Sequence, residues 1–169
     1  MKKWFALAFL AAAACSGGDE DDGPMFEMPQ ILPERTPACV TSTAAVVGDS
    51  LKYDFAVNNR GRETLLITGG ELVDDDGGHF RYSEMRLSVG SDPCTDATPC
   101  ALEYLDDSAF ARFFYEPTGP GWHSANLLIY SNAENFPILQ TYVLARARPE
   151  DDPDYVFGDK PAEAQGACD

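Results

Sequence analysis

Five cysteines are the residues of this chain with the clearest chemical potential. Cys39, Cys94, Cys100 and Cys168 form an even set, which outside the cytosol is typical of two disulfides. Cys94 and Cys100 flank a turn-rich stretch that a local bridge would close easily, and Cys39 and Cys168 then pair by exclusion. Four cysteines allow three pairings, so this connectivity is one prediction among three.

A metal centre is the competing interpretation of these thiols, with His79 and His123 as further ligands. Zinc sites commonly place two cysteines two to four residues apart, whereas five residues separate Cys94 from Cys100. The spacing therefore favours a disulfide, and each histidine is expected to be a surface residue rather than a catalytic base.

Three consecutive carboxylates, Asp74, Asp75 and Asp76, precede two glycines, and this pattern could indicate a calcium site. An EF-hand loop opening at Asp74 would need glycine at its sixth position and glutamate at its twelfth, but His79 and Met85 stand there. These aspartates remain weak metal candidates in a solvated turn. No nucleotide-binding, serine-hydrolase or zinc-protease motif is present, so we expect no cofactor, no catalytic residue and no enzymatic activity.

Cys15 ends an apolar run that starts at Trp4 and follows Lys2 and Lys3. This is the layout of a secretory signal, and the run is shorter than the about 20 residues of a membrane-spanning helix. The sequence Ala12-Ala13-Ala14-Cys15 resembles the lipobox of bacterial lipoproteins, whose cysteine is acylated, with palmitate among the acyl chains expected, and begins the mature chain. The resemblance implies a signal peptide over 1–14 and lipidation at Cys15. The alternative is an unmodified cysteine after an ordinary cleaved signal.

Charge and composition divide the rest of the chain. The net charge of −16 disfavours nucleic acid as a partner. Residues 15–37 are acidic and proline-rich, which predicts an extended linker. Residues 149–169 form a similar acidic tail, in which only Tyr155, Val156 and Phe157 could dock. Ser16 after the cysteine resembles the sorting signal of outer-membrane lipoproteins in Gram-negative bacteria.

Between these ends, residues 38–148 show short runs of alternating apolar residues separated by turn signals. This pattern predicts an all-β fold, an immunoglobulin-like antiparallel β-sandwich of seven to eight strands, with its aromatic residues in the core. Gly69-Gly70 predicts a bulge or kink. The expected strands are Val40–Val47, Leu51–Val57, Glu63–Val73, Phe80–Tyr82, Met85–Val89, Ala109–Tyr115, Ala125–Tyr130 and Ile138–Ala147.

An ordered set of short motifs resembles ASH-type immunoglobulin-like domains, which bacterial surface proteins also carry as choice-of-anchor D-like repeats. The motifs are Val47-Gly48, Asn58-Asn59-Arg60-Gly61, Leu65-Leu66-Ile67, Phe80, Ala111-x-Phe113-x-Tyr115-x-Pro117, Gly121, Ala125-x-Leu127-x-Ile129-x-Ser131-Asn132 and Tyr142-x-Leu144. Tyr115 and Arg146 depart from the family's usual phenylalanine and glycine, and residues 90–108 resemble an insertion. The resemblance implies binding or scaffolding without catalytic residues.

These observations predict a lipid-anchored protein of the cell envelope, held at the outer membrane through Cys15, whose sandwich binds another envelope protein at its periplasmic or surface face. The alternative is an adhesive module that binds calcium through Asp74–Asp76 or a glycan through exposed Trp122 and Tyr130. Nothing in the sequence specifically supports a small enzyme.

Overall fold

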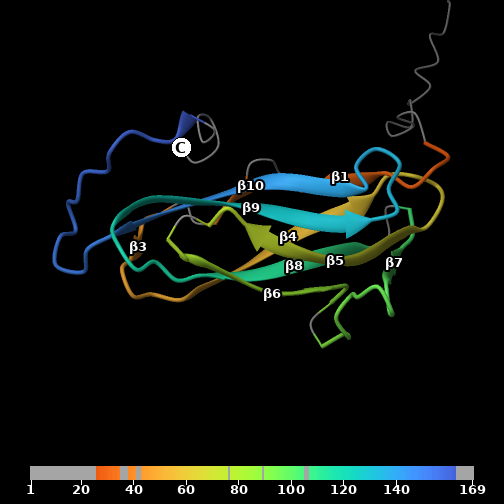
Figure 1. Ribbon diagram of the computed structural model, residues 1–169, viewed down its shortest axis with the longest axis horizontal. Helices are drawn as coiled ribbons and strands as arrows, with labels where there is room; N and C mark the ends of the chain where they lie inside the picture. Colours follow the sequence, from red (N-terminus) through yellow and green to blue (C-terminus); the bar gives the residue numbers. More distant parts are fainter. Residues whose placement is uncertain are drawn as a thin grey trace, which may run out of the picture.

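Two β-sheets packed face to face form the body of the molecule (Figure 1). The computed structural model describes residues 26–34, 38–40, 43–75, 77–88, 90–104 and 107–162. The predicted all-β, immunoglobulin-like sandwich is confirmed, with ten strands in the described ranges because several are very short. No helix in these ranges is long and apolar enough to cross a membrane.

The first sheet has four strands in the order β1-β4-β8-β6, and each neighbouring pair is antiparallel. Its strands are β1 (Ile31–Pro33), β4 (Leu51–Asn59), β8 (Ser108–Tyr115) and β6 (Phe80–Arg86). β1 and β6 are therefore the two edges of this sheet.

The second sheet has the order β2-β10-β9-β5-β7, with β3 also paired to β10. β2 and β3 run parallel to β10, whereas the other pairs are antiparallel. Its strands are β2 (Ala38–Cys39), β3 (Ala45–Val46), β10 (Ile138–Arg148), β9 (Gly121–Ser131), β5 (Leu65–Val73) and β7 (Cys100–Leu102).

Alternation along the strands builds the core between the sheets. In β8, Ala109, Ala111, Phe113 and Tyr115 are fully buried, while the residues between them are half-buried on the outward face. β9 repeats this pattern with Ala125, Leu127 and Ile129. Period-two alternation puts one side of each strand into the core. Two aromatics predicted for the core, Phe110 and Phe114, lie outward, and the Arg81 guanidinium sits 4.4 Å from the centre of the Phe114 ring.

Three strand predictions need correction. The expected strand Val40–Val47 is replaced by the two short strands β2 and β3. The two expected strands Phe80–Tyr82 and Met85–Val89 are a single strand, β6, whose register shifts between Tyr82 and Glu84. That bulge changes which residues face the core and so divides one strand into two apparent patterns in the sequence.

The predicted linker 15–37 is wrong over its last part. Ile31–Pro33 forms β1 and pairs with the end of β4, and the Ile31 side chain is fully buried. Pro33 fits because β1 is an edge strand that needs no complete set of backbone donors. Proline content therefore indicated the extended conformation correctly but missed that this segment belongs to the sandwich.

Residues 90–108, predicted as an insertion, contribute a strand of their own. β7 begins at Cys100 and pairs with Leu65–Ile67 of β5. The Cys94–Cys100 disulfide is confirmed, with the two Cα atoms 5.0 Å apart. The bridge therefore holds β7 next to the loop that leads into it.

Candidate binding cleft

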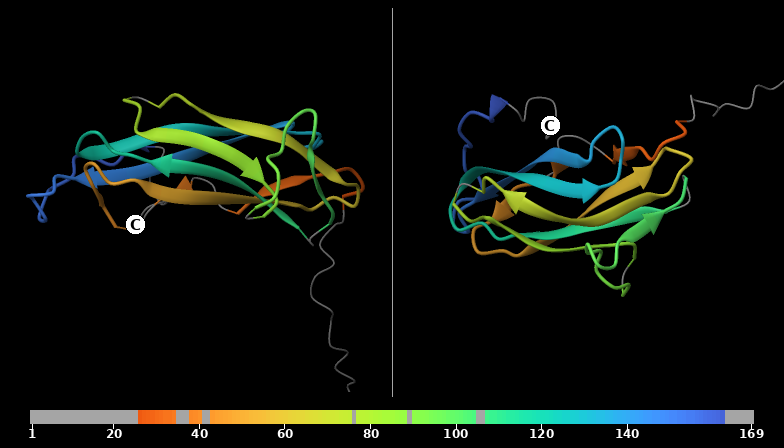
Figure 2. Two further views of the ribbon diagram at one scale, coloured as in Figure 1. Left: turned by 90° about the horizontal axis from the view of Figure 1, so that it is seen from below. Right: turned by 45° about the vertical axis from the view of Figure 1, so that its right-hand side comes forward.

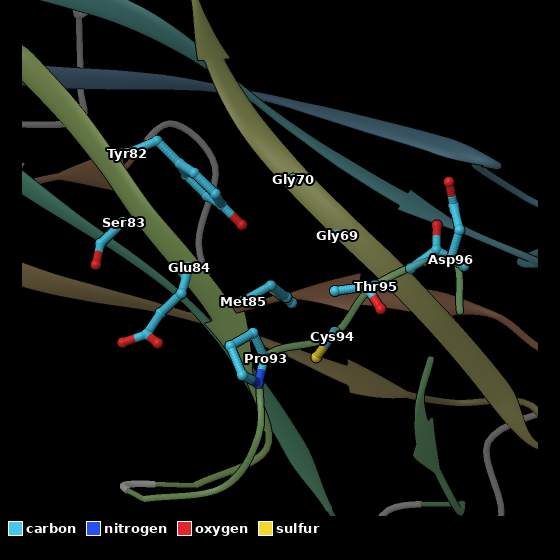
Figure 3. A pocket seen from close by; sticks show the side chains of 11 residues that line it. Gly69, Gly70, Tyr82, Ser83, Glu84, Met85, Pro93, Cys94, Thr95 and Asp96 are labelled. Carbon is cyan, nitrogen blue, oxygen red and sulfur yellow. The ribbon is translucent and has the colours of Figure 1, made fainter. Parts of the chain in front are cut away.

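A cleft of about 430 Å³ opens between β5 and β6, the strands that face each other across one side of the sandwich (Figure 3). Figure 3 shows the Tyr82 ring reaching from β6 toward Gly70 on β5, with the loop through Cys94 at the other end. The lining residues are Thr68, Gly69, Gly70, Tyr82, Ser83, Glu84, Met85, Pro93, Cys94, Thr95 and Asp96.

Bulges in both flanking strands create this cleft. The β5–β9 register shifts between Ile67 and Gly69, which confirms the bulge predicted at Gly69-Gly70, and β6 shifts between Tyr82 and Glu84. Gly69 has φ of 148°, a conformation that other residues rarely adopt. A bulge bends and twists its strand, so two facing bulges separate the sheets locally.

Gly70 is required by close packing. A Cβ atom there would lie 2.7 Å from the Leu128 carbonyl oxygen and 3.2 Å from the Tyr82 hydroxyl. Burial raises the pKa of Tyr82 to about 12, against the opposing effect of a backbone hydrogen bond from Gly70. The phenol is therefore neutral at physiological pH and serves as a link between the sheets.

β5 also presents an open edge beside the cleft, defined here as Thr68–Val73. β7 covers β5 only from Leu65 to Ile67, while β9 pairs with its other side as far as Val73. β6 is likewise an edge strand, and the Met85 carbonyl accepts a hydrogen bond from the Cys94 amide at 2.7 Å. Unpaired strand edges can accept another extended chain.

The two histidines, predicted to be separate surface residues, stack on each other with ring centres 3.6 Å apart. His79 is buried, and its Nδ1 accepts a hydrogen bond from the Thr118 amide at 3.2 Å. The Tyr115 hydroxyl lies 2.7 Å from His123 Nδ1. Desolvation first, and then the neighbouring His79, lower the pKa of His123 to about 4, whereas Asp75 acts in the opposite direction.

This histidine pair joins the two sheets rather than forming a metal centre. His79 immediately precedes β6, and His123 lies on β9. Both Nδ1 atoms are engaged with hydroxyl or amide groups of the protein. Among the described residues, no group of three or more histidine, cysteine or acidic side chains could hold a metal ion.

The acidic candidates for calcium do not converge. Asp75 accepts the backbone amides of His79 and Phe80 at 2.9 and 2.8 Å. Asp74 instead accepts the Asn126 amide at 2.9 Å, and Asp76 lies outside the described residues. The two described carboxylates thus cap a turn and pair with a neighbouring strand, which is the structural role that such residues often take.

The aromatics expected to be exposed are also engaged. Trp122 is half-buried against Phe157 of the C-terminal tail, with ring centres 6.1 Å apart. The Tyr130 hydroxyl donates a hydrogen bond to Glu71. The expectation that Trp122 and Tyr130 are exposed is therefore wrong, since both are half-buried, whereas the expectation that Tyr155–Phe157 could dock is met at Phe157.

The remaining predicted site residues have mixed outcomes. Cys39 is disulfide-bonded, and its predicted partner Cys168 lies outside the described residues, so that pairing stays a prediction. Cys15 also lies outside them. The stacking of His79 on His123 and the bulge in β6 were missed. The Gly69-Gly70 motif, which indicated the bulge in β5, was the only sequence signal for the cleft.

Comparisons with known proteins place only the general fold. No family model matches the chain, and no curated protein matches it. A secreted serine protease, VesC from Vibrio cholerae, is similar over 70% of this chain at 15% identity with a TM-score of 0.49, and the chain spans 23% of that protein's length.

Two smaller solved structures are also similar. The ASH/PapD-like domain 7 of human CEP192 matches 87% of this chain and 99% of its own length, at 10% identity with a TM-score of 0.42. A lipoprotein from Bacteroides thetaiotaomicron matches 84% of this chain and 98% of its own length, at 14% identity with a TM-score of 0.34. Similarity this low indicates no ligand or activity.

Proposed function

We propose that this protein is a non-enzymatic, lipid-anchored envelope protein whose sandwich binds an extended segment of another protein. The segment adds to the open edge Thr68–Val73 and places side chains into the adjoining cleft. Cys15 carries the anchor, and the outer membrane is the proposed location. Strand addition draws affinity from backbone hydrogen bonds and specificity from pockets for alternate side chains.

The observation that carries this proposal is the change along the edge of β5. β7 already adds to this edge at Leu65–Ile67, and the edge is open from Thr68 onward, where the cleft of about 430 Å³ begins. An incoming strand beside Thr68–Val73 would find backbone that no described strand covers and an adjoining pocket, and it would displace the Tyr82 hydroxyl from Gly70. The Cys94–Cys100 bridge holds the first residue of β7, which pairs with Ile67 at the point where β7 ceases to cover β5.

The charge of the chain indicates the partner's chemistry. The net charge is −16, and the exposed carboxylates Glu71 and Asp96 lie on the open edge and at the cleft. A segment that alternates small apolar residues with lysine or arginine would fill the cleft and neutralise these acids. Complementary charge of this kind increases association rates and specificity.

Two groups of side chains that could act in catalysis, the Arg112–Asp54 pair and the two histidines, are engaged in structural contacts. Arg112 donates two hydrogen bonds to Asp54, at 2.7 and 2.8 Å, which lower the pKa of that carboxyl group. The histidine pair is bound by Tyr115 and Thr118. A general base needs a free position toward substrate, so these contacts support a binding role.

The first described residues also support the proposed lipid anchor at Cys15. Phe26 and Met28, near the start of the described residues, are 51% and 45% exposed. These two apolar side chains follow the proposed lipidation site by 11 and 13 residues in the sequence, so they could contact the membrane surface when Cys15 is anchored there. Replacing Cys15 with serine should abolish acyl labelling and release the protein into the soluble fraction. Unchanged membrane fractionation would contradict the anchor.

Site-specific photo-crosslinking tests the binding site in intact cells. A benzophenone amino acid at Thr95, in the cleft, should trap one discrete partner, while the same group at Lys52, on the outward face of β4, should not. The crosslinked peptide, made synthetically, should then protect the Thr68–Val73 amides from hydrogen exchange. Equal trapping from both positions, or no protection of this edge, would reject the proposed site.

A further inference from the structure

Trp122 and Arg146 form a surface on the outward side of the second sheet, far in sequence from the cleft. The two residues are directly opposite each other on β9 and β10. The Arg146 guanidinium lies 5.4 Å from the centre of the Trp122 ring, a distance at which a cation is attracted to the face of an aromatic ring. We call these two residues the Trp122–Arg146 surface.

A segment of the same chain occupies this surface. After β10 the chain leaves the sheet and turns back toward it (Figures 1 and 2). Phe157 packs on Trp122, and the Arg146 guanidinium lies 5.3 Å from the centre of the Phe157 ring. The Lys160 ammonium lies 5.8 Å from the centre of the Trp122 ring. Arg146 is thus shared between a sheet aromatic and a tail aromatic.

Few main-chain interactions hold this segment. Within the described residues 150–162, one backbone hydrogen bond is present, from the Tyr155 amide to the Asp152 carbonyl at 3.3 Å, and it is internal to the segment. Val156, next to Phe157, is 86% exposed. The aromatic and cation–π contacts of Phe157 and Lys160 with the Trp122–Arg146 surface are therefore the main contacts described between this segment and the sheet.

Trp122 also has a hydrogen-bond donor without an acceptor among the described residues. Its indole Nε1 is buried and has no hydrogen-bond partner within the described part of the chain. Buried donors in native proteins are nearly always paired. A ligand that supplied an acceptor oxygen here would improve on the contact that Phe157 makes.

We propose that the Trp122–Arg146 surface is a second protein-binding site, and that residues 154–160 occupy it as a built-in competitor. The bound segment defines the ligand chemistry: an aromatic side chain flanked by carboxylates, as Phe157 is by Asp154 and Asp159. A partner segment of this kind packs its ring on Trp122, places an acid near Arg146 and displaces the tail. This site does not depend on the proposed function of the cleft.

The covalent connection of residues 154–160 to β10 determines how tightly a partner segment must bind in order to displace the tail. A short flexible connection gives the tail an effective concentration of about 10⁻³ M at its own site. A partner segment with the same contacts therefore binds only when the tail is weakened or when it adds contacts of its own, such as an acceptor for the Trp122 indole. The tail makes the surface selective against weak ligands.

Tryptophan fluorescence tests the proposal directly. The sequence contains two tryptophans, Trp4 and Trp122, so a Cys15→Ser chain starting at residue 15 reports Trp122 alone. Phe157→Ala should shift its emission to longer wavelength, because Trp122 loses its cover. Val156→Ala, one residue away and exposed, is the matched control and should leave the emission unchanged.

The ligand is a synthetic peptide of residues 154–160 with blocked ends. It should bind the Phe157→Ala chain with a Kd of about 10⁻⁴–10⁻³ M and bind the unchanged chain about two- to tenfold more weakly. Adding Arg146→Gln to Phe157→Ala should remove binding. The proposal is overturned if Phe157→Ala leaves the emission unchanged, if both chains bind the peptide equally, or if neither binds it.

Discussion

The two sides of the sandwich are closed in different ways. On one side the chain itself passes from the first sheet at β1 to the second sheet at β2 and β3. The β9–β10 loop also reaches β1: Asn135 Oδ1 accepts the Ile31 amide at 3.0 Å, and its Nδ2 donates to the Ile31 carbonyl at 2.9 Å. This is the closed side of the molecule.

On the opposite side, β5 and β6 face each other across the cleft. Within the described part of the chain, the links between the sheets here are side-chain or loop contacts: Tyr82 to Gly70, the His79–His123 stack, and the loop that Cys94 anchors to Met85. The same fold thus leaves part of the edge of β5 without a paired strand, among the described residues, where two bulged strands meet. The comparison indicates that stability is concentrated on the closed side and binding capacity on the open side.

The largest expected effect comes from Asn59, which pairs with β1 on the closed side and also donates a hydrogen bond to Leu102 of β7. This side chain is fully buried; it donates to the Glu63 and Leu102 carbonyls and accepts the Gly61 amide, at 2.8, 3.0 and 2.8 Å. Asn59→Ala leaves these groups buried and unpaired, so chemical unfolding should show a loss of about 3 kcal/mol. The half-buried neighbour Asn58 is the control, and Asn58→Ala should cost less than about 1 kcal/mol. Equal losses of unfolding free energy in the two variants would show that the buried hydrogen bonds of Asn59 do not cause the effect.

The disulfide gives the next effect, on the open side. Replacing Cys94 and Cys100 together by alanine should lower the free energy of unfolding by about 2 kcal/mol, because the short loop then gains freedom in the unfolded state. Hydrogen exchange should increase at Leu65–Ile67, which β7 covers, and not at β1. Faster exchange at β1 as well would mean that the two sides are not independent.

The sequence predicted the layers better than the edges. Alternation in β4, β8 and β9 reflects one buried face, and β10 alternates except at the buried run Val143–Ala145. Those strands were recovered within a few residues. β6 was divided in two because its bulge interrupts the period. β1 and β7 were missed as strands because two or three paired residues leave no pattern to detect.

The site was harder to predict for a similar reason. Gly69-Gly70 is a local signal, and it identified the bulge. The stack of His79 on His123 depends on the alignment of residues from different sheets, which no local pattern encodes. Trp122 is outward by alternation, as expected, but its cover comes from a tail whose composition resembles a solvated linker.

Lowering the pH should weaken the open side through His123. Its pKa is about 4 in the folded protein and about 6.5 when unfolded, so the unfolded state binds more protons as pH falls below 7. Stability should therefore decrease by about 1–2 kcal/mol between pH 7 and 5, after allowance for partial solvent exposure. His123→Gln keeps an acceptor for Tyr115 and should reduce this slope; an unchanged slope would assign it to other groups.

The smallest expected effect separates stability from binding. Tyr82→Phe removes only the hydroxyl that meets Gly70, so the free energy of unfolding should fall by about 1 kcal/mol or less. Hydrogen exchange at Thr68–Val73 should nevertheless increase severalfold, because the link between β5 and β6 is lost, while exchange at β1 stays constant. Tyr53→Phe, on β4 in the same sheet and separated from β6 by β8, is the matched control and should leave the Thr68–Val73 amides unchanged. If both variants affected this edge equally, the Tyr82 hydroxyl would not be what holds the open side together.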